Sequence, residues 1–472
     1  MSPHIPYGMW AAALTCLCAG PSVAQDLVTV YEQAQHSDPV IHAARHALEA
    51  AREKWPQARA ALLPNVAVTA SKGRQQGQGS FNDAPFVDRS VNNWTWTLQL
   101  TQPLWRLGPW RALAEAEASV RQAEAQHAGA QQDLMLRVAK AYFDVLAAED
   151  AVTVADAQIR AVQAQQVAAK RAFDVGTSTI SDVHEAQARL DLALAQRVAA
   201  LGDVDTRRAE LDRMLGTPAG RLATLDATRP LPAPEPADAQ SWISQARLQH
   251  PSVIQQSAAL DAAEQGLRRQ RAEHLPALDL TASRGTEFSS GTLSSPADIA
   301  TRARSTRLGV QLTIPLFAGG ATESRVRESA ANRERARSEL ESAQRTAAMQ
   351  ARQAFTGVTT GLSQCEALVS AVASSRSALR ANEVGYRTGT RINIDVLNAQ
   401  QQLYAAQRDL AKARYETLMH GLRLKAAAGV LSPEDLHGVN AHLLSPQDVS
   451  GTTETPDSQP PSPPRHVLNT VP

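Results

Sequence analysis

Two aspartates are the side chains in this sequence best placed to cap a helix or to attract cations, because each follows a glycine that ends a predicted helix. Asp182 comes after Gly176, and Asp395 comes after Gly389 at the equivalent position in the second half of the chain. An acid in the first turn of a helix is favoured by the helix dipole, and Thr179 could join Asp182 in a capping box. A ring of carboxylates at a constriction would instead attract cations. The residues alone leave both interpretations open.

Patterns for enzymatic chemistry are absent from the sequence. The 12 histidines show no HExxH spacing, no glycine-rich phosphate loop follows a strand, and there is no nucleophile elbow. We therefore expect no enzyme, no cofactor and no metal site. Lys plus Arg and Asp plus Glu balance at 47 each, which gives no support for nucleic-acid binding. Cys365 lies among small residues of a helical seam and is predicted to be a buried filler rather than a reactive thiol.

The positions of proline and glycine indicate that the 472-residue chain contains the same fold twice. Pro39 corresponds to Pro251 and Gly216 to Gly429, and further pairs lie between them. Since both residue types constrain backbone geometry, their matched positions predict a duplicated structure. The predicted order of elements in each copy is helix, strand, strand, helix, helix. The predicted parts are a signal peptide at 1–24, a first repeat at 25–216, a Pro-rich linker at 217–240, a second repeat at 241–444 and a disordered tail at 445–472.

The start of the chain predicts export from the cytoplasm. An apolar stretch leads to Ser22-Val23-Ala24, which fits a small-x-small cleavage site, although no Lys or Arg precedes the stretch. Neither Cys16 nor Cys18 follows the small residue that lipoprotein processing favours, so we expect no lipid anchor. No later stretch reaches the roughly 18 apolar residues of a membrane-spanning helix. A route into a membrane must therefore use strands.

Four segments alternate polar and apolar residues and are predicted strands, at about 65–73, 92–102, 277–285 and 305–314. Alternation over about ten residues is typical of membrane strands, although a soluble hairpin with one buried face gives the same pattern. Four of the seven tryptophans lie in or just after the second segment, as an interfacial aromatic belt requires: Trp94, Trp96, Trp105 and Trp110. Together with the export signal, this clustering favours the membrane interpretation.

The helix that follows each pair of strands is long. Between Trp110 and Phe173 the chain has no proline and one glycine, Gly129, which predicts roughly 95 Å of continuous helix. Larger and small residues alternate at a 3-4 spacing along its second half, as in a coiled-coil seam. Shorter predicted helices at about 39–63 and 181–215 could lie end to end beside it.

Four strands are too few to close a membrane barrel. About eight is the smallest workable number, and an open sheet edge cannot survive in lipid. If these strands span a membrane, several chains must share one barrel: two chains would enclose a plugged interior, and three would enclose a lumen. The long helices must then extend away from the membrane, so the pattern predicts a conduit.

The order of elements and two kinds of motif resemble the TolC family of outer-membrane export ducts over about residues 26–440. The motifs are the strand ends Gln102-Pro103-Leu104 and Ile314-Pro315-Leu316, and the turns at 173–177 and 386–391. The resemblance implies a mainly α-helical fold with membrane β-strands, in which a homotrimer forms a twelve-stranded β-barrel continued by an α-helical barrel. It implies the outer membrane of a Gram-negative bacterium, with the helices in the periplasm. The implied partners are outer-membrane lipid, a periplasmic adaptor (a membrane fusion protein) and an inner-membrane transporter, expected to be of the ABC type.

The resemblance also implies roles for residues around the two glycine turns. In such ducts the periplasmic end of the tunnel closes like an iris, held by an acid, a tyrosine and an arginine that link neighbouring helices. Asp182, Tyr386 and Arg391 match those places, and Ser181 matches a polar neighbour of the acid. These four residues form the predicted gate.

Two further sets of residues follow from the resemblance. The family can carry two rings of Asp that filter cations; Asp395 matches one ring, whereas Asn398 stands at the place of the other. The turn residues would form an exposed tip that an adaptor touches, although the glycines could equally serve only to end helices. The predicted tip consists of Val175, Gly176, Thr177, Thr388, Gly389 and Thr390.

The sequence thus predicts the trimeric outer-membrane channel-tunnel of a tripartite exporter. The missing lipid anchor favours type I secretion of a large polypeptide such as a toxin, as in CyaE-like ducts. The duct of a multidrug efflux pump is the alternative within the family. A periplasmic coiled-coil scaffold or adaptor without a pore is the alternative outside it, but such a protein would not explain four alternating strands.

Overall fold

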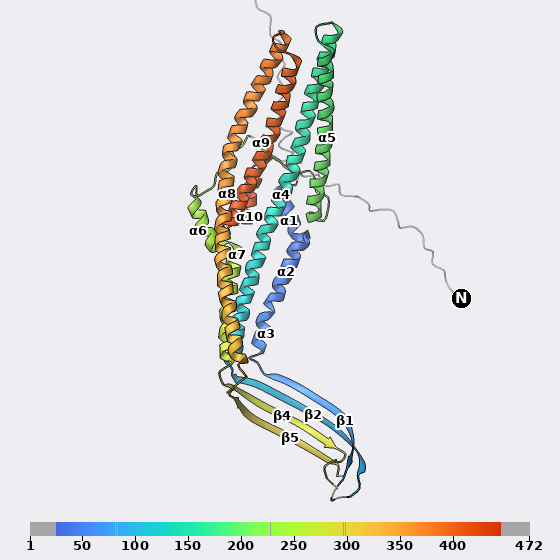
Figure 1. Cartoon of the computed structure of the whole chain (residues 1–472), viewed down its shortest axis with the longest axis vertical. Helices are drawn as coiled ribbons and strands as arrows, with labels where there is room; N and C mark the ends of the chain where they lie inside the picture. Colours follow the sequence, from blue (N-terminus) through green and yellow to red (C-terminus); the bar gives the residue numbers. More distant parts are fainter. Residues whose placement is uncertain are drawn as a thin grey trace, which may run out of the picture.

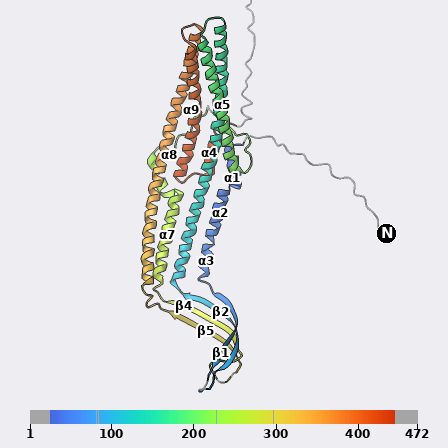
Figure 2. The ribbon, with the colours of Figure 1, turned by 45° about the vertical axis from the view of Figure 1, so that its right-hand side comes forward.

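The computed structural model describes residues 25–80, 82, 84–226, 228–295, 297 and 299–444. The predicted signal peptide at 1–24 and the predicted tail at 445–472 lie outside the described residues. The described chain is an elongated bundle of helices with a four-stranded sheet at one end (Figures 1 and 2). The predicted mainly helical fold, with one pair of strands in each half of the chain, is confirmed.

Two long helices run the length of the bundle, one from each half of the chain (Figure 1). α4 (Leu107–Asp174) has 68 residues and α8 (Ala321–Arg387) has 67, so each is about 100 Å long. α5 (Ile180–Leu215) returns beside α4, and α9 (Asn393–Ala427) returns beside α8. Each returning helix covers the half of its partner that is farther from the sheet (Figure 1).

Shorter helices cover the half of each long helix that is nearer the sheet. α1 (Leu27–Ser37), α2 (Pro39–Arg52) and α3 (Lys54–Ala60) lie against α4, while α6 (Ala239–Gln249) and α7 (Pro251–Ala272) lie against α8. α7 also packs along α4, which joins the two halves of the chain. Asp38 caps α2, and Pro39 occupies its first turn.

The prediction of one unbroken helix at about 39–63 is wrong, because the structure interrupts it at Glu53. Pro56 lacks the N–H that would bond to the carbonyl of Arg52, and its ring would crowd that carbonyl. α2 therefore ends at Arg52, and α3 begins at Lys54. This second start places Pro56 in a first turn, where a missing N–H does no harm.

One antiparallel sheet combines the strands of both halves. The strands are β1 (Asn65–Gly79), β2 (Val87–Trp105), β4 (Ala277–Ser289) and β5 (Thr301–Thr313), and their order in the sheet is β1-β2-β4-β5. These strands are longer than the segments predicted at about 65–73, 92–102, 277–285 and 305–314. The backbone ladder continues where apolar alternation stops, helped by polar pairs such as Arg74 Nε donating to Ser90 Oγ at 2.7 Å. Side-chain alternation therefore underestimated the length of the strands.

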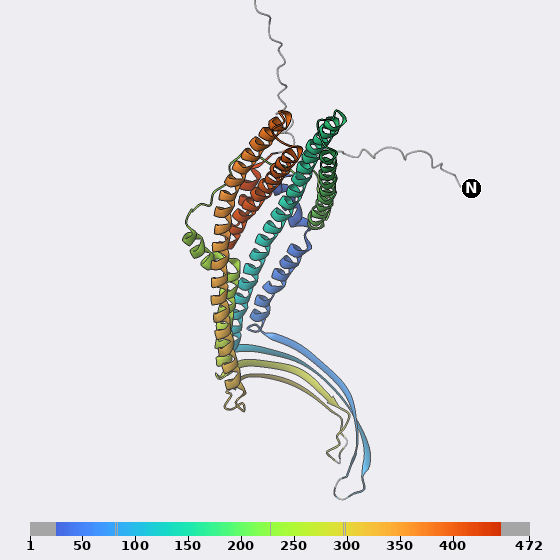
Figure 3. The ribbon, with the colours of Figure 1, turned by 45° about the horizontal axis from the view of Figure 1, so that its top comes forward.

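The sheet curves away from the axis of the helices (Figure 3). At its base, Arg106 forms an ion pair with the buried carboxylate of Asp279, which ties the start of α4 to β4. β1 and β5 are the two edges of the sheet, and each has one neighbouring strand in the chain.

The segment predicted as a linker, 217–240, contains a short strand that joins the two halves of the chain. β3 (Thr224–Leu225) pairs with β6 (Leu443–Leu444), which follows α10 (Pro433–Asn440). The most extensive apolar cluster packs α1, α4, α5, α9 and α10 around Tyr142. The hydroxyl of Tyr142 donates to the carbonyl of Ala223 at 2.8 Å. The main core therefore lies midway along the bundle, away from the sheet and from the helix ends.

Small residues let α8 and α9 approach each other closely. A methyl group on Gly361 would lie 2.6 Å from Oγ1 of Thr417 on α9, so a side chain there would push the helices apart. Cys365 is buried in the same seam, with its sulfur 3.6 Å from Thr417 Oγ1. The predicted buried position of Cys365 is confirmed.

The duplication supplies a matched pair of glycines for a stability test. Gly216 and Gly429 correspond in the two halves and have left-handed φ angles of 71° and 79°. A methyl group on Gly216 would meet Ser37 Cβ at 3.8 Å, which is ordinary contact. On Gly429 it would lie 2.2 Å from the carbonyl oxygen of Gln249, so the backbone would have to move.

We predict that Gly216→Ala lowers the free energy of unfolding by about 1–3 kcal/mol, the cost of a left-handed residue that carries a side chain. Gly429→Ala should lower it clearly further, because the collision with Gln249 adds to the same strain. Thermal unfolding of both purified variants, followed by circular dichroism in one detergent, measures the difference. Equal destabilisation by the two substitutions would contradict the close approach at Gly429.

Candidate functional site

The two glycine turns lie at the same end of the bundle, farthest from the sheet (Figures 1 and 2). Gly176 and Gly389 adopt left-handed φ angles of 78° and 76°. Each turn closes with a backbone bond that caps the preceding helix, from Thr177 N at 2.8 Å and from Thr390 N at 2.9 Å. All six residues of the predicted tip are exposed in the protomer, and Val175 is 74% exposed.

The Asp182 carboxylate caps the start of α5 instead of forming an ion pair with a basic side chain. Its Oδ2 accepts hydrogen bonds from Ser178 Oγ at 2.6 Å, from Thr179 N at 3.0 Å and from Thr179 Oγ1 at 2.9 Å. The Thr179 side chain in turn accepts from the backbone N–H of Asp182, which completes a capping box. The hydrogen bond from Ser178 is the main cause that lowers the pKa of Asp182, so the carboxylate is ionised near neutral pH.

Arg391 lies just before α9 and pairs with Asp395. The distance from Arg391 Nη1 to Asp395 Oδ2 is 3.7 Å, a contact across one helical turn. Within the described residues of one protomer, no ion pair joins Arg391 to Asp182. A methyl group on Gly385 would lie 2.6 Å from Arg391 Cγ, so this glycine leaves the room in which the arginine side chain lies.

Tyr386 lies close enough to Asp182 to be affected by its charge. Burial raises the pKa of Tyr386 above its usual value, and the Asp182 carboxylate raises this pKa further. Ser181, the polar neighbour of the acid, is exposed. The structure thus places Tyr386 near Asp182 across the two halves of the chain, while Arg391 faces its own helix.

The sequence analysis missed Asn393, which joins three helices just behind the tip. Asn393 is 2% exposed. Its Nδ2 donates to the carbonyl of Asp182 at 3.1 Å, and its Oδ1 accepts from Gln165 Nε2 at 2.6 Å. These bonds connect α9 with α5 and α4. The spacing could have revealed it, because Asn393 shares one buried helical stripe with Val396 and Leu397.

Asn398, which the resemblance places at the second acidic ring, accepts a hydrogen bond from an arginine. Arg189 on α5 donates to Asn398 Oδ1 at 3.0 Å and to Gln401 Oε1 at 2.5 Å. The guanidinium brings positive charge to a position where an acid would attract cations. Asp395 remains partly accessible, with 34% of its side chain exposed.

The sheet has one apolar and one polar face, and the strand register carries each face across all four strands. Leu100 faces Val66 on β1 and Ala282 on β4, and Ala282 faces Leu308 on β5. The neighbouring positions Thr69, Thr97 and Gly285 show the other face, which is small and polar. Alternation of this kind is the pattern of a strand between lipid and a watery interior.

The four tryptophans singled out by the sequence lie around the apolar face. Trp94 and Trp96 are on it, and Trp94 stacks on Phe288 with ring centroids 6.0 Å apart. A bulge after Pro103 brings Trp105 opposite Leu278, on the same face. Trp110 lies near the start of α4 and is 60% exposed.

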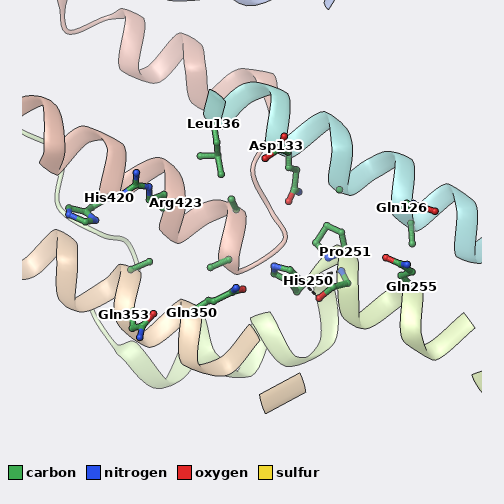
Figure 4. A pocket seen from close by; sticks show the side chains of 17 residues that line it. Gln126, Asp133, Leu136, His250, Pro251, Gln255, Gln350, Gln353, His420 and Arg423 are labelled. Carbon is green, nitrogen blue, oxygen red and sulfur yellow. Dashed lines mark hydrogen bonds between the residues drawn. The ribbon is translucent and has the colours of Figure 1, made fainter. Parts of the chain in front are cut away.

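A cavity of about 620 Å³ lies between α4, α7, α8 and α9, away from the tip and the sheet (Figure 4). Its lining mixes glutamines with Asp133, His250 and Arg423, and contains none of the predicted site residues. Among the described residues, no group of three or more His, Cys, Asp or Glu could hold a metal ion. Of the helices that the structure describes, none has both the length and the apolar character needed to cross a bilayer.

Comparison with known proteins identifies relatives along nearly the whole chain. A sequence profile of the outer membrane efflux protein family matches residues 30–217 and again residues 242–430. The chain is 32% identical over 421 residues to the outer membrane protein TolC of Vibrio cholerae, covering 89% of this chain and 94% of that protein. It is 30% identical over 445 residues to the alkaline protease secretion protein AprF of Pseudomonas aeruginosa, covering 92% of this chain and 90% of that protein.

A solved structure shares the fold at lower sequence identity. The outer membrane channel CmeC of Campylobacter jejuni superposes with a TM-score of 0.73 at 17% identity, over 93% of this chain and 97% of that chain. The shared architecture includes the helices and the sheet alike, because the superposition spans nearly all of both chains.

Proposed function

This chain belongs to the outer membrane efflux protein family, and we propose that three copies of it form a duct through which a type I secretion system exports a large polypeptide. It is an outer-membrane channel protein of the TolC type, whose helices extend into the periplasm. In the proposed trimer, the sheets pool into one barrel and the helices continue it as one tunnel.

The observation that carries this proposal is the unclosed sheet. Its apolar face suits lipid and its small polar face suits a water-filled lumen, yet β1 and β5 each lack a second neighbour among the strands that the structure describes. In lipid, backbone groups without partners cost several kcal/mol each, so the edges must pair with other copies. Three copies supply twelve strands, which is enough for an open lumen.

One comparison favours a polypeptide cargo over small molecules. The relative AprF is a protease secretion protein by name and aligns with 92% of this chain. The proposed partners are a periplasmic adaptor and an inner-membrane transporter of the ABC type. The duct of a multidrug efflux pump is the second candidate, favoured by the family's description as efflux proteins.

We predict that deleting the gene removes a large polypeptide from the culture supernatant and retains it in the cells, with little change in drug sensitivity. Supplying the gene on a plasmid should restore the supernatant protein. Mass spectrometry of the supernatant and growth inhibition assays measure the two effects. An unchanged supernatant combined with increased drug sensitivity would contradict polypeptide secretion and support the efflux duct.

We propose that the exposed turns dock the adaptor. All six tip residues are accessible, and two further apolar side chains near them are exposed, Val384 by 54% and Ile392 by 62%. Exposed apolar side chains at the end of a polar rod suit a partner that covers them.

We also propose that Asp182, Tyr386, Arg391 and Ser181 form a weak latch at the tip. In the protomer Asp182 is held by its capping box and Arg391 by Asp395, so a bond between them would compete with local contacts. A partly exposed ion pair contributes about 0.2–1 kcal/mol. Three copies would bias the tunnel towards closure by a few kcal/mol at most, which a docking partner can overcome.

Removing both charges of this latch should open the tunnel. We predict that Asp182→Ala combined with Arg391→Ala raises single-channel conductance in planar bilayers, because three latches of roughly 0.6–3 kcal/mol in total are lost. Arg387→Ala is the matched control, since Arg387 lies in the same turn and its Nε donates to the backbone carbonyl of Glu383. Conductance that rises equally in the control, or in neither variant, would remove these residues from the gate.

We predict that Asp395→Asn lowers the preference of the channel for cations, because it removes the one acidic ring. Asn398→Asp should raise that preference only slightly, since Arg189 would neutralise the new acid. Adding Arg189→Gln to Asn398→Asp should raise it further. Reversal potentials in a salt gradient measure all three variants, and identical potentials throughout would place Asp395 and Asn398 outside the conducting path.

A further inference from the structure

A row of aromatic and basic side chains crosses the apolar face of the sheet near its distal end. Lys72 on β1 faces Trp94 on β2, Trp94 faces Phe288 on β4, and Phe288 faces Arg302 on β5. Trp94 stacks on Phe288, and the Arg302 guanidinium lies 5.8 Å from the centre of the Phe288 ring. We call these four residues the outer row.

The outer row lies about one membrane thickness from the base of the sheet. At the base, Trp105, Leu278 and Leu312 occupy one row of the same face. From Leu278 to Phe288 the strand extends about 34 Å. With the usual tilt of 35–45°, this length spans about 25 Å along the membrane normal, the height of an apolar band. The outer row therefore marks the interface on the side away from the helices.

Positive charge is concentrated at and around the outer row. Besides Lys72 and Arg302, the same face carries Arg304 one row nearer the base and Arg284 one row nearer still. None of these four has an acidic partner among the described residues. The one acid on this face of the four strands is Asp88, which accepts from Gln78 at 2.8 Å.

Such charges are costly on a lipid-facing surface unless an anion meets them. An arginine on a lipid-facing strand is strongly destabilising at the membrane centre and nearly neutral close to the interface. Arg284 lies two rows inside the outer row, so its side chain must extend towards the interface to leave the apolar band. A phosphate there would receive paired N–H donors from a guanidinium.

Two of these charges lie on the edge strands of the sheet. Lys72 lies on edge strand β1 and Arg302 on edge strand β5. In the proposed trimer both edges lie at junctions between copies, so each junction carries basic side chains from both copies on its lipid-facing side.

We propose that the outer row, with Arg304 and Arg284, binds the phosphate groups of lipid A, the phosphorylated glycolipid of the outer leaflet. This inference rests on the proposed function, because it requires the apolar face to contact lipid and the row to lie at the outer leaflet. The ligand is assigned by its chemistry: acyl chains suit the apolar rows, and phosphates suit the guanidinium and ammonium groups directly above them.

The test compares binding of lipid A by the purified full-length protein and two variants. The first variant combines Lys72→Gln, Arg302→Gln and Arg304→Gln. The second, Arg307→Gln, removes an arginine from the opposite face of β5 and is the matched control. Each protein is reconstituted into phosphatidylcholine vesicles that contain lipid A, extracted in mild detergent, and analysed for retained lipid A by mass spectrometry.

We expect the triple variant to retain lipid A at least about tenfold less well, since the charge-assisted hydrogen bonds of three side chains to phosphate are lost. Arg307→Gln should retain it like the unaltered protein. Replacing Arg302 and Arg304 by Lys should preserve part of the binding, because the charge remains while the paired donors are lost. Removing the phosphates from lipid A should abolish the difference between the proteins.

Three results would overturn the inference. The first is equal retention of lipid A by the triple variant and the control. The second is retention of dephosphorylated lipid A by the unaltered protein at the level of intact lipid A, and the third is displacement of lipid A by an equal concentration of phosphatidylglycerol. Trimer bands on heated and unheated gels and channel conductance are measured on the same samples. Trimeric, conducting protein without phosphate-dependent retention would refute the lipid inference alone, whereas protein that forms no trimer and no channel would refute the proposed function.

Discussion

The structure depends on the unpaired edges of a single sheet. On their outer edges, β1 and β5 each present a row of backbone N–H and C=O groups that pair with no other strand in the described part of the chain. In lipid these groups cannot turn to water, and each one left unpaired costs several kcal/mol. Because the four strands alternate in direction, β5 of one copy meets β1 of the next as an antiparallel neighbour. Insertion into the membrane and assembly of copies therefore depend on the same backbone hydrogen bonds, those between β5 of one copy and β1 of the next.

The helices face different constraints at their two ends. Near the sheet, α7 packs along both α4 and α8, and Arg106 joins the start of α4 to Asp279, so this end is firmly tied to the strands. At the tip, a polar chain from Gln165 through Asn393 to the Asp182 carbonyl joins the helix pairs. Each neutral hydrogen bond of this kind contributes only about 0.5–1.5 kcal/mol net. The end of the bundle near the sheet is thus fixed, whereas a small change in free energy can rearrange the tip.

The sequence predicts those features of the fold that depend on local geometry. Glycine turns, long proline-free helices and alternating strands follow from the chain itself, and the strands differ mainly in length. The break at Glu53 depends on where Pro56 falls within a turn, and the pairing of β3 with β6 depends on contacts between distant segments. At the candidate site, the capping box of Asp182 was readable from residue spacing. The pairing of Arg391 with Asp395 was not, because it depends on the shape of the turn and on space left by Gly385.

The two equivalent aspartates show how equivalent residues of a duplicated fold can make different contacts. Asp182 and Asp395 each follow the N-cap of a returning helix, but the N-cap is Thr179 in one half and Ile392 in the other. The threonine hydroxyl closes a capping box and holds Asp182, whereas isoleucine has no hydroxyl and leaves Asp395 without that bond. Asp395 is then available to Arg391, and its partly exposed carboxylate keeps its charge accessible. A single change of residue type at one cap therefore separates an acid held in a capping box at the start of a helix from an acid whose carboxylate stays accessible.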